Sequence, residues 1–215
     1  MKLDIQKKQK DPAKKDIKFI LSLLNSNKFV EVKKEIDKQI INFPNSSILF
    51  NILGATLAGQ NELNKAVENY NRAIQINPNY AQAHNNLGVA LHKLRKINEA
   101  ANSYKKSLSL KSDFAESFNN LGNAMVDLNK PKEAVQYFEK AIKIKSNYAE
   151  AYNSLGAVSK ILANKEKALN YYKEAIKIKK DYFDAYNNLG LLYCDLGRFD
   201  ESKSSYNRAI EINPN

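Results

Sequence analysis

Residues 81–114 read AQAHNNLGVALHKLRKINEAANSYKKSLSLKSDF, and residues 115–148 read AESFNNLGNAMVDLNKPKEAVQYFEKAIKIKSNY. Both stretches carry Leu-Gly near their start and small and aromatic residues at the same later places. The glycine of this pattern recurs every 34 residues, at Gly54, Gly88, Gly122, Gly156 and Gly190. A fixed period of this size indicates an internal repeat.

The repeat becomes readable when each of these glycines is numbered position 8 of a unit. Position 4 is then aromatic or His, position 7 is Leu, positions 20 and 27 are Ala or Ser, and position 24 is Tyr or Phe in all five units. Apolar residues three and four apart are typical of one helix face. Short polar stretches such as 60–62 and 196–198 separate the two halves. Each unit is therefore predicted to be an antiparallel helical hairpin.

Glycine at position 8 needs a packing reason, because Gly inside a helix costs about 1 kcal/mol relative to Ala. We expect it, with the small residues at 20 and 27, to let the two helices approach closely while the aromatic residues fill the space beside them. Pro44, Pro78 and Pro214 at position 32 are expected to end the second helix. Where Ser112, Ser146 or Lys180 stands there, a less definite helix end is predicted.

These columns resemble those of the tetratricopeptide repeat, whose period is 34 residues. The resemblance implies an all-α fold, a right-handed α-solenoid of antiparallel helical hairpins, in which each hairpin buries its apolar face against its neighbours. It also implies a concave channel lined by the first helix of each unit.

The same frame divides the whole chain. Residues 1–12 are predicted to be a basic flexible tail, and 13–46 a divergent capping hairpin with Phe19 at position 7 and Val32 and Ile36 at positions 20 and 24. The repeats then span 47–80, 81–114, 115–148, 149–182 and 183–215. The fifth is incomplete, with no C-terminal capping helix, so self-association through this repeat is a further expectation.

Asparagine dominates the positions that the resemblance assigns to the channel. It fills position 5 of all five units and much of position 6, where it resembles the asparagine ladder of the protein O-GlcNAc transferases. An amide offers both donors and an acceptor to an extended peptide backbone. The alternative is that these amides orient neighbouring repeats. The candidate peptide-binding residues are Asn51, Asn85, Asn86, Asn119, Asn120, Asn123, Asn153, Asn187 and Asn188.

Acidic residues at positions 2 and 13 are secondary candidates, namely Glu116, Asp127, Glu150, Asp184 and Asp195. In the channel they would favour a basic peptide. The alternative for position 2 is that an acid in the first helical turn is stabilised by the helix dipole, whatever binds.

Composition excludes other classes. The net charge of +11 is assigned to a solvated outer face, so nucleic-acid binding is not predicted. The sequence has neither an apolar run long enough to insert into a membrane nor a signal-peptide core. A single cysteine and two histidines provide neither a disulfide nor a metal site, and there is no cofactor motif. We expect a non-catalytic cytoplasmic scaffold that binds an extended peptide segment of a partner protein. The alternative is the substrate-recognition array of a larger transferase, O-GlcNAc-transferase-like or sulfotransferase-like.

Overall fold

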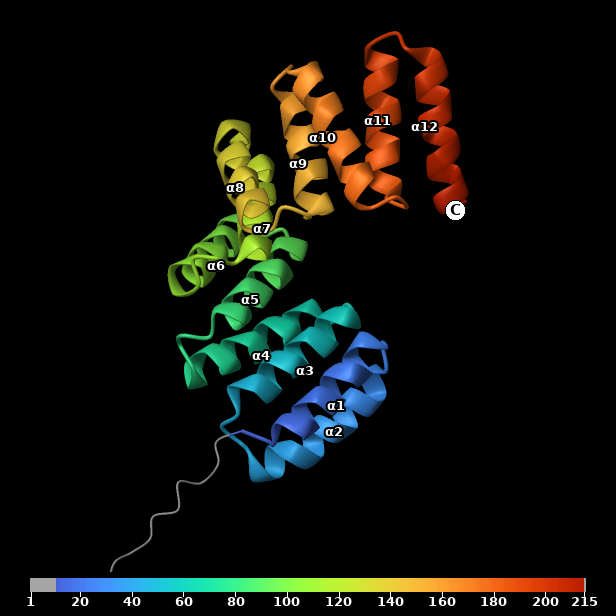
Figure 1. Cartoon of the computed structure of the whole chain (residues 1–215). Helices are drawn as coiled ribbons and strands as arrows, with labels where there is room; N and C mark the ends of the chain where they lie inside the picture. The colour runs from blue at the N-terminus through green and yellow to red at the C-terminus, as the bar shows by residue number, and fades with distance from the viewer. Residues whose placement is uncertain (1–10, 215) are drawn as a thin grey trace, which may run out of the picture. The chain divides into compact units, whose positions relative to one another are not determined.

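The computed structural model describes residues 11–214, and in that range the chain contains twelve α-helices and no strand (Figure 1). The helices are α1 (Lys14–Asn25), α2 (Phe29–Asn42), α3 (Ser47–Gly59), α4 (Leu63–Ile76), α5 (Ala81–Lys93), α6 (Ile97–Leu110), α7 (Ala115–Asp127), α8 (Pro131–Ile144), α9 (Ala149–Ile161), α10 (Lys165–Ile178), α11 (Phe183–Asp195) and α12 (Phe199–Ile212). Most of the predicted tail, residues 1–10, lies outside the described residues.

The chain forms two compact units, one up to Lys111 with α1 to α6 and one from Ser112 with α7 to α12. Inside each unit, consecutive helices pair into hairpins, and the second helix of a hairpin packs against the first helix of the next. The predicted all-α array of antiparallel hairpins is confirmed.

The repeated glycines lie directly beneath the aromatic ring at position 24 of their own hairpin. A β-carbon built on Gly122 would lie 2.5 Å from Cε1 of Phe138, and one on Gly88 would lie 2.5 Å from Cε1 of Tyr104. Such distances are far inside van der Waals contact, which lies near 3.5–4.0 Å for carbon atoms. The expected close-contact role of glycine is therefore confirmed. The rings, which were expected beside this contact, form it themselves.

Each hairpin turns through one residue with positive φ, always at the same place in the repeat: Asn27, Asn61, Arg95, Asn129 and Ala163 at φ of 54° to 62°, and Gly197 at 72°. The second helices also end at the same place, whether proline follows, as after Ile76, or serine follows, as after Ile144. The less definite ends predicted for units without proline are thus not observed. The same backbone hydrogen bond ends the helix in both cases, because the N–H of Asn77 donates to the oxygen of Ala73 and that of Lys145 donates to the oxygen of Ala141.

The first hairpin buries Ile20, Val32 and Ile36 completely. Phe19, expected in a core position, is instead 53% exposed. Residues at this repeat position are covered by the preceding hairpin, as Leu189 is by Tyr172, and no described helix precedes α1. Just before α1, Asp11 Oδ1 accepts a 2.6 Å hydrogen bond from the Ser46 hydroxyl.

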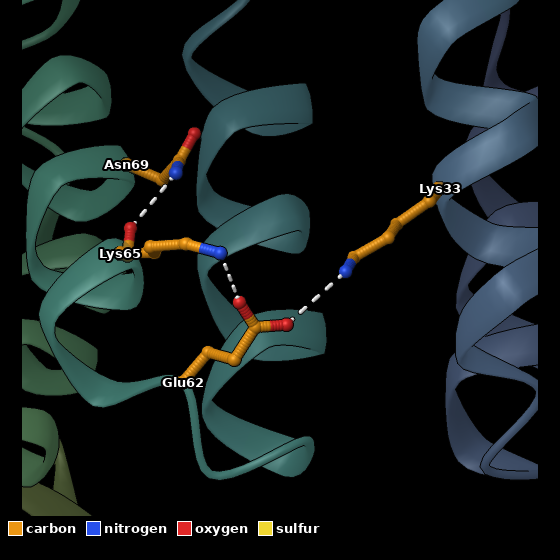
Figure 2. Close-up of polar contacts among 4 residues, drawn as sticks. All are labelled: Lys33, Glu62, Lys65 and Asn69. Carbon is orange, nitrogen blue, oxygen red and sulfur yellow. Dashed lines mark hydrogen bonds and ion pairs between the residues drawn. The ribbon is translucent and has the colours of Figure 1, made fainter.

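One carboxylate connects two neighbouring hairpins of the first unit (Figure 2). Glu62, in the turn before α4, lies 3.4 Å from Nζ of Lys33 on α2 and 2.5 Å from Nζ of Lys65. The backbone oxygen of Lys65 in turn accepts a 2.8 Å hydrogen bond from the amide of Asn69. The hydrogen bond from Lys65 is the main cause that lowers the pKa of Glu62, and Lys33 acts in the same direction.

Candidate functional site

The candidate asparagines differ in how far they reach solvent. At position 5, Asn51, Asn85 and Asn119 are buried, whereas Asn153 and Asn187 are half-buried. The remaining candidates are all half-buried, namely Asn86, Asn120, Asn123 and Asn188. Solvent therefore reaches mainly the half-buried amides.

Asparagines of successive hairpins hydrogen-bond to one another. The Asn86 Nδ2 atom donates to Oδ1 of Asn51 at 3.0 Å, and Asn188 Nδ2 donates to Oδ1 of Asn153 at 3.1 Å. Gln82 Nε2 in turn donates to Oδ1 of Asn86 at 2.9 Å. Orientation of neighbouring repeats, which the sequence left open as an alternative, is thus one role of these side chains.

Ser154 interrupts this pattern in the second unit. It occupies position 6, but its hydroxyl points to Oδ1 of Asn123 at 3.4 Å. The buried Oδ1 of Asn119 accepts no hydrogen bond in the described structure. Serine is too short to supply the donor that asparagine provides in the other pairs. An unpaired buried acceptor is destabilising. The contact between neighbouring hairpins is therefore less stable here than at the hydrogen-bonded asparagine pairs.

Tyrosines at the last position of the repeat complete the amide network. Tyr80 shares a side-chain hydrogen bond with Asn51, and Tyr182 shares one with Asn153. Burial raises the pKa of Tyr182 to about 12, so its hydroxyl is neutral at physiological pH. These tyrosines were not among the predicted site residues. Their signal is the aromatic column at position 34, formed by Tyr80, Phe114, Tyr148 and Tyr182.

A pocket of about 300 Å³ opens beside the Asn51–Asn86 pair in the first unit. It is formed by α1, α3, the start of α5 and the residue before α5. Its lining combines aliphatic side chains with amides and one phenol, and none of the lining residues is charged: Leu21, Leu24, Ile48, Asn51, Ile52, Ala55, Tyr80, Gln82 and Asn86.

All five acidic candidates are exposed, and two lie next to lysines: Glu116, Asp127, Glu150, Asp184 and Asp195. Glu150 lies 3.9 Å from Nζ of Lys179, which also sits 4.6 Å from the centroid of the Tyr182 ring. Asp195 lies 2.9 Å from Nζ of Lys160, and that hydrogen bond lowers the pKa of Asp195. The acidic character of this face is therefore partly neutralised.

His84 and Cys194 are residue types that can serve in catalysis or metal binding, but here each contacts a neighbouring group of the fold. His84 is buried, with Nε2 3.0 Å from the backbone oxygen of Pro78. Cys194 is exposed, and its Sγ lies 3.1 Å from the Ser202 hydroxyl. Across residues 11–214, no three His, Cys, Asp or Glu side chains gather closely enough to hold a metal ion. None of the described helices has the length and apolar character needed to cross a membrane.

Family models match most of the chain. A model described as Tetratricopeptide repeat matches residues 81–114, 115–148 and 183–215, and one described as TPR repeat matches 54–94 and 164–197. The chain belongs to the tetratricopeptide repeat family. The finer likeness to the arrays of O-GlcNAc transferases stays a prediction.

Solved tetratricopeptide structures resemble this chain over most of its length. MamA is 27% identical, with a TM-score of 0.65, and the match covers 75% of this chain and 95% of MamA. PilF of Pseudomonas aeruginosa is 20% identical, with a TM-score of 0.81 and coverage of 93% and 90%. YrrB, described as a TPR protein with an unusual peptide-binding site, is 23% identical, with a TM-score of 0.63 and coverage of 84% and 93%. At such identities PilF and YrrB show the fold alone. A search of curated protein sequences gives no significant match.

The last tetratricopeptide hairpin differs from the others on its second helix. The outer face of α12 carries Asp200, Lys203, Ser204, Asn207, Arg208 and Glu211. Lys203 stands where the four middle hairpins have apolar residues, namely Val67, Ala101, Val135 and Leu169, and where the first hairpin has Lys33. Phe199 and Ile210 are 71% and 58% exposed. This surface is mostly polar, with two separate apolar side chains.

Proposed function

We propose that this tetratricopeptide protein is a non-catalytic scaffold that binds an extended segment of a partner protein on the faces formed by its first helices. The observation that carries the proposal is the pocket of the first unit, where the linked amides of Asn51 and Asn86 lie beside aliphatic side chains. The description of YrrB as a TPR protein with a peptide-binding site agrees with such a role.

An extended peptide fits this chemistry. Its backbone presents N–H and C=O groups to both sides, and successive side chains point in opposite directions. Half-buried amides such as Asn86 and Asn188 can meet the backbone with both donor and acceptor atoms. Buried members such as Asn51 hold these amides in place through the hydrogen bonds already described. The exposed acids of the second unit add a preference for Lys or Arg in the part of the segment bound there.

Selection from a phage-displayed library of random peptides tests the proposal. We expect the protein to enrich peptides, and the triple variant Asn86→Ala, Asn120→Ala, Asn188→Ala to lose at least about tenfold in affinity for them. The matched control replaces three exposed asparagines of second helices, Asn98, Asn170 and Asn207, with alanine and keeps full affinity. If no peptide is enriched, or if both triple variants bind equally, the proposal is wrong.

A second function uses the same face. The position-6 amides Asn86, Asn120 and Asn188 are half-buried, which suits the ladder that resembles O-GlcNAc transferases. The chain would then present substrates to a transferase whose catalytic domain is elsewhere. Sequencing the gene beyond the codon for residue 215 tests this version, which requires a catalytic domain in the continuing reading frame or on a stable partner.

Self-association through the last hairpin is a separate proposal. It rests on the exposed side chains of Phe199 and Ile210, and the polar character of their surroundings argues for a weak contact. Light scattering over a range of concentrations is the measurement. A concentration-dependent dimer that disappears in the variant Phe199→Ser, Ile210→Ser supports it, and a monomer at all concentrations excludes it.

A further inference from the structure

We infer that the pocket of the first unit accepts one uncharged aliphatic side chain of the bound segment, so that the preferred partners carry Leu, Ile, Val or Met at this point. The inference rests on the proposed function and adds the chemical class of the ligand. Aliphatic side chains line the pocket together with neutral amides, which are called its rim below.

The aliphatic side of the pocket comes from two hairpins. Leu21 and Leu24 belong to α1, and Ile48, Ile52 and Ala55 to α3. Leu21 is 39% exposed, so an aliphatic ligand would cover apolar surface that now faces water. Removal of such surface from water is favourable in proportion to its area. The pocket therefore has a reason to bind an apolar group.

Charged ligands are disfavoured at the same place. The lining residues are uncharged, although 27% of the whole sequence is Asp, Glu, Lys or Arg. Asp11 lies close enough to Tyr80 to influence it, but its carboxylate accepts the hydrogen bond of Ser46 and is not part of the lining. A charge that enters the pocket would lose hydration without gaining an opposite charge from the lining.

The rim is held in place before any ligand binds. Gln82 donates to Asn86, Asn86 donates to Asn51, and Asn51 shares a hydrogen bond with Tyr80. Fixed neutral amides suit the peptide groups on either side of an inserted side chain. The volume of about 300 Å³ is at the lower limit for small-molecule pockets, which agrees with one side chain and its flanking backbone.

The repeat frame shows why this pocket occurs in the first repeat. The residues at positions 6 and 9 are Ile52 and Ala55 there, and only there does an aliphatic residue at 6 meet a small residue at 9. At the same two positions the other repeats have Asn86 and Val89, Asn120 and Asn123, Ser154 and Ala157, and Asn188 and Leu191. Ile52 lines the pocket although it is only 2% exposed, and the short side chain of Ala55 leaves space beside it.

The direct test is an NMR titration of the full chain with three blocked amino acids: the N-acetyl, N′-methylamide derivatives of leucine, lysine and aspartate. The side-chain amide signals of Asn51 and Asn86 report binding. For a ligand of this size we expect a dissociation constant on the order of 1 mM for the leucine derivative. Binding of the lysine and aspartate derivatives should be at least about tenfold weaker.

A matched pair of variants locates the binding. Ala55→Leu fills the pocket and should weaken the leucine derivative at least about tenfold. Ala157→Leu makes the same change at the same repeat position of α9 and should have no effect. Leucine occurs naturally at this position as Leu191, so both variants are expected to fold, which circular dichroism checks.

The inference is overturned if the lysine derivative binds as tightly as the leucine derivative, or if Ala55→Leu leaves binding unchanged. Phage-selected peptides separate its failure from failure of the proposed function. If those peptides depend on the asparagines but contain no common aliphatic residue and tolerate Ala55→Leu, the scaffold function stands and the pocket assignment is wrong.

Discussion

Asn86 Nδ2 donates a 3.0 Å hydrogen bond to Oδ1 of Asn51, so an amide in one repeat satisfies a buried amide in the repeat before it. Replacing the donor leaves the buried acceptor unpaired, which costs about 1–3 kcal/mol. We expect Asn86→Ala to lower the free energy of unfolding by about that amount in urea titrations followed by circular dichroism. The exposed Asn98→Ala serves as control and should change stability little. Equal stability of the two variants would contradict the role of the pair.

The opposite change should stabilise the second unit. Ser154→Asn restores the donor that the other pairs have, and Asn119 Oδ1 gains a partner. We expect a gain of about 1 kcal/mol in the free energy of unfolding. A double-mutant cycle provides the control, because the gain should vanish when Asn119 is also replaced by alanine. A gain that persists without Asn119 would have another cause.

The glycine beneath the ring gives a third prediction. Alanine at position 122 would place its β-carbon 2.5 Å from Cε1 of Phe138. Overpacking of this kind costs about 1–3 kcal/mol, although alanine is intrinsically the better helix former. Gly122→Ala should therefore lower the unfolding temperature. Adding Phe138→Leu to that variant should recover part of the loss, because the smaller side chain can move away. A variant as stable as the wild type would show that the ring is not fixed.

Turn residues give a fourth prediction. Ala163 turns the chain at φ 59°, where residues with a β-carbon are disfavoured, and Gly197 does so at φ 72° at the equivalent place. Ala163→Gly should raise stability by about 1 kcal/mol, and Gly197→Ala should lower it by a similar amount. Thermal unfolding of the two single variants measures both. Changes of the same sign would contradict the explanation.

Acid should weaken the contact around Glu62. Its pKa in the folded chain is lowered, first by the hydrogen bond from Lys65, below the ordinary value of about 4.3. The stabilisation is therefore complete above that value and is lost as pH falls through the folded pKa. Lys65→Met should move the pKa of Glu62 upward in an NMR titration, while Lys105→Met on α6 should leave it unchanged. An unchanged pKa in the Lys65 variant would contradict this assignment.

The hairpin architecture could be predicted from the sequence because its physical causes repeat. The glycine and aromatic residues recur in all five repeats. Because the contact between them lies inside one hairpin, it can be predicted without knowing how the rest of the chain is arranged. The helix ends without proline were predicted less well. Helices α4 and α8 end with the same backbone hydrogen bond although proline follows only α4, so proline alone does not decide where these helices end.

The candidate site was only partly predictable. The asparagines lie on the first helix of each hairpin, as predicted. The burial of Asn51 and its hydrogen bond to Asn86 depend on the distance between repeats, which the sequence does not give. The pocket was not predicted, because part of its lining, Leu21 and Leu24, comes from the divergent first hairpin. The repeat pattern does not specify how that hairpin packs beside Ala55. Phe19 was wrongly predicted to lie in the core for a related reason. The repeat pattern assumes a preceding hairpin that covers this position, and no described helix precedes α1.

The contact between each repeated glycine at position 8 and its ring lies inside one period, because Gly54 meets Tyr70 and Gly156 meets Tyr172 in their own hairpins, whereas Gly59 meets Phe29 of the hairpin before it. Unequal recombination that duplicates or deletes one whole period would therefore keep every remaining glycine of position 8 with its own ring. Each copied piece of the gene thus encodes both partners of this close contact. Such an array can change its number of hairpins during evolution without first having to repair its core.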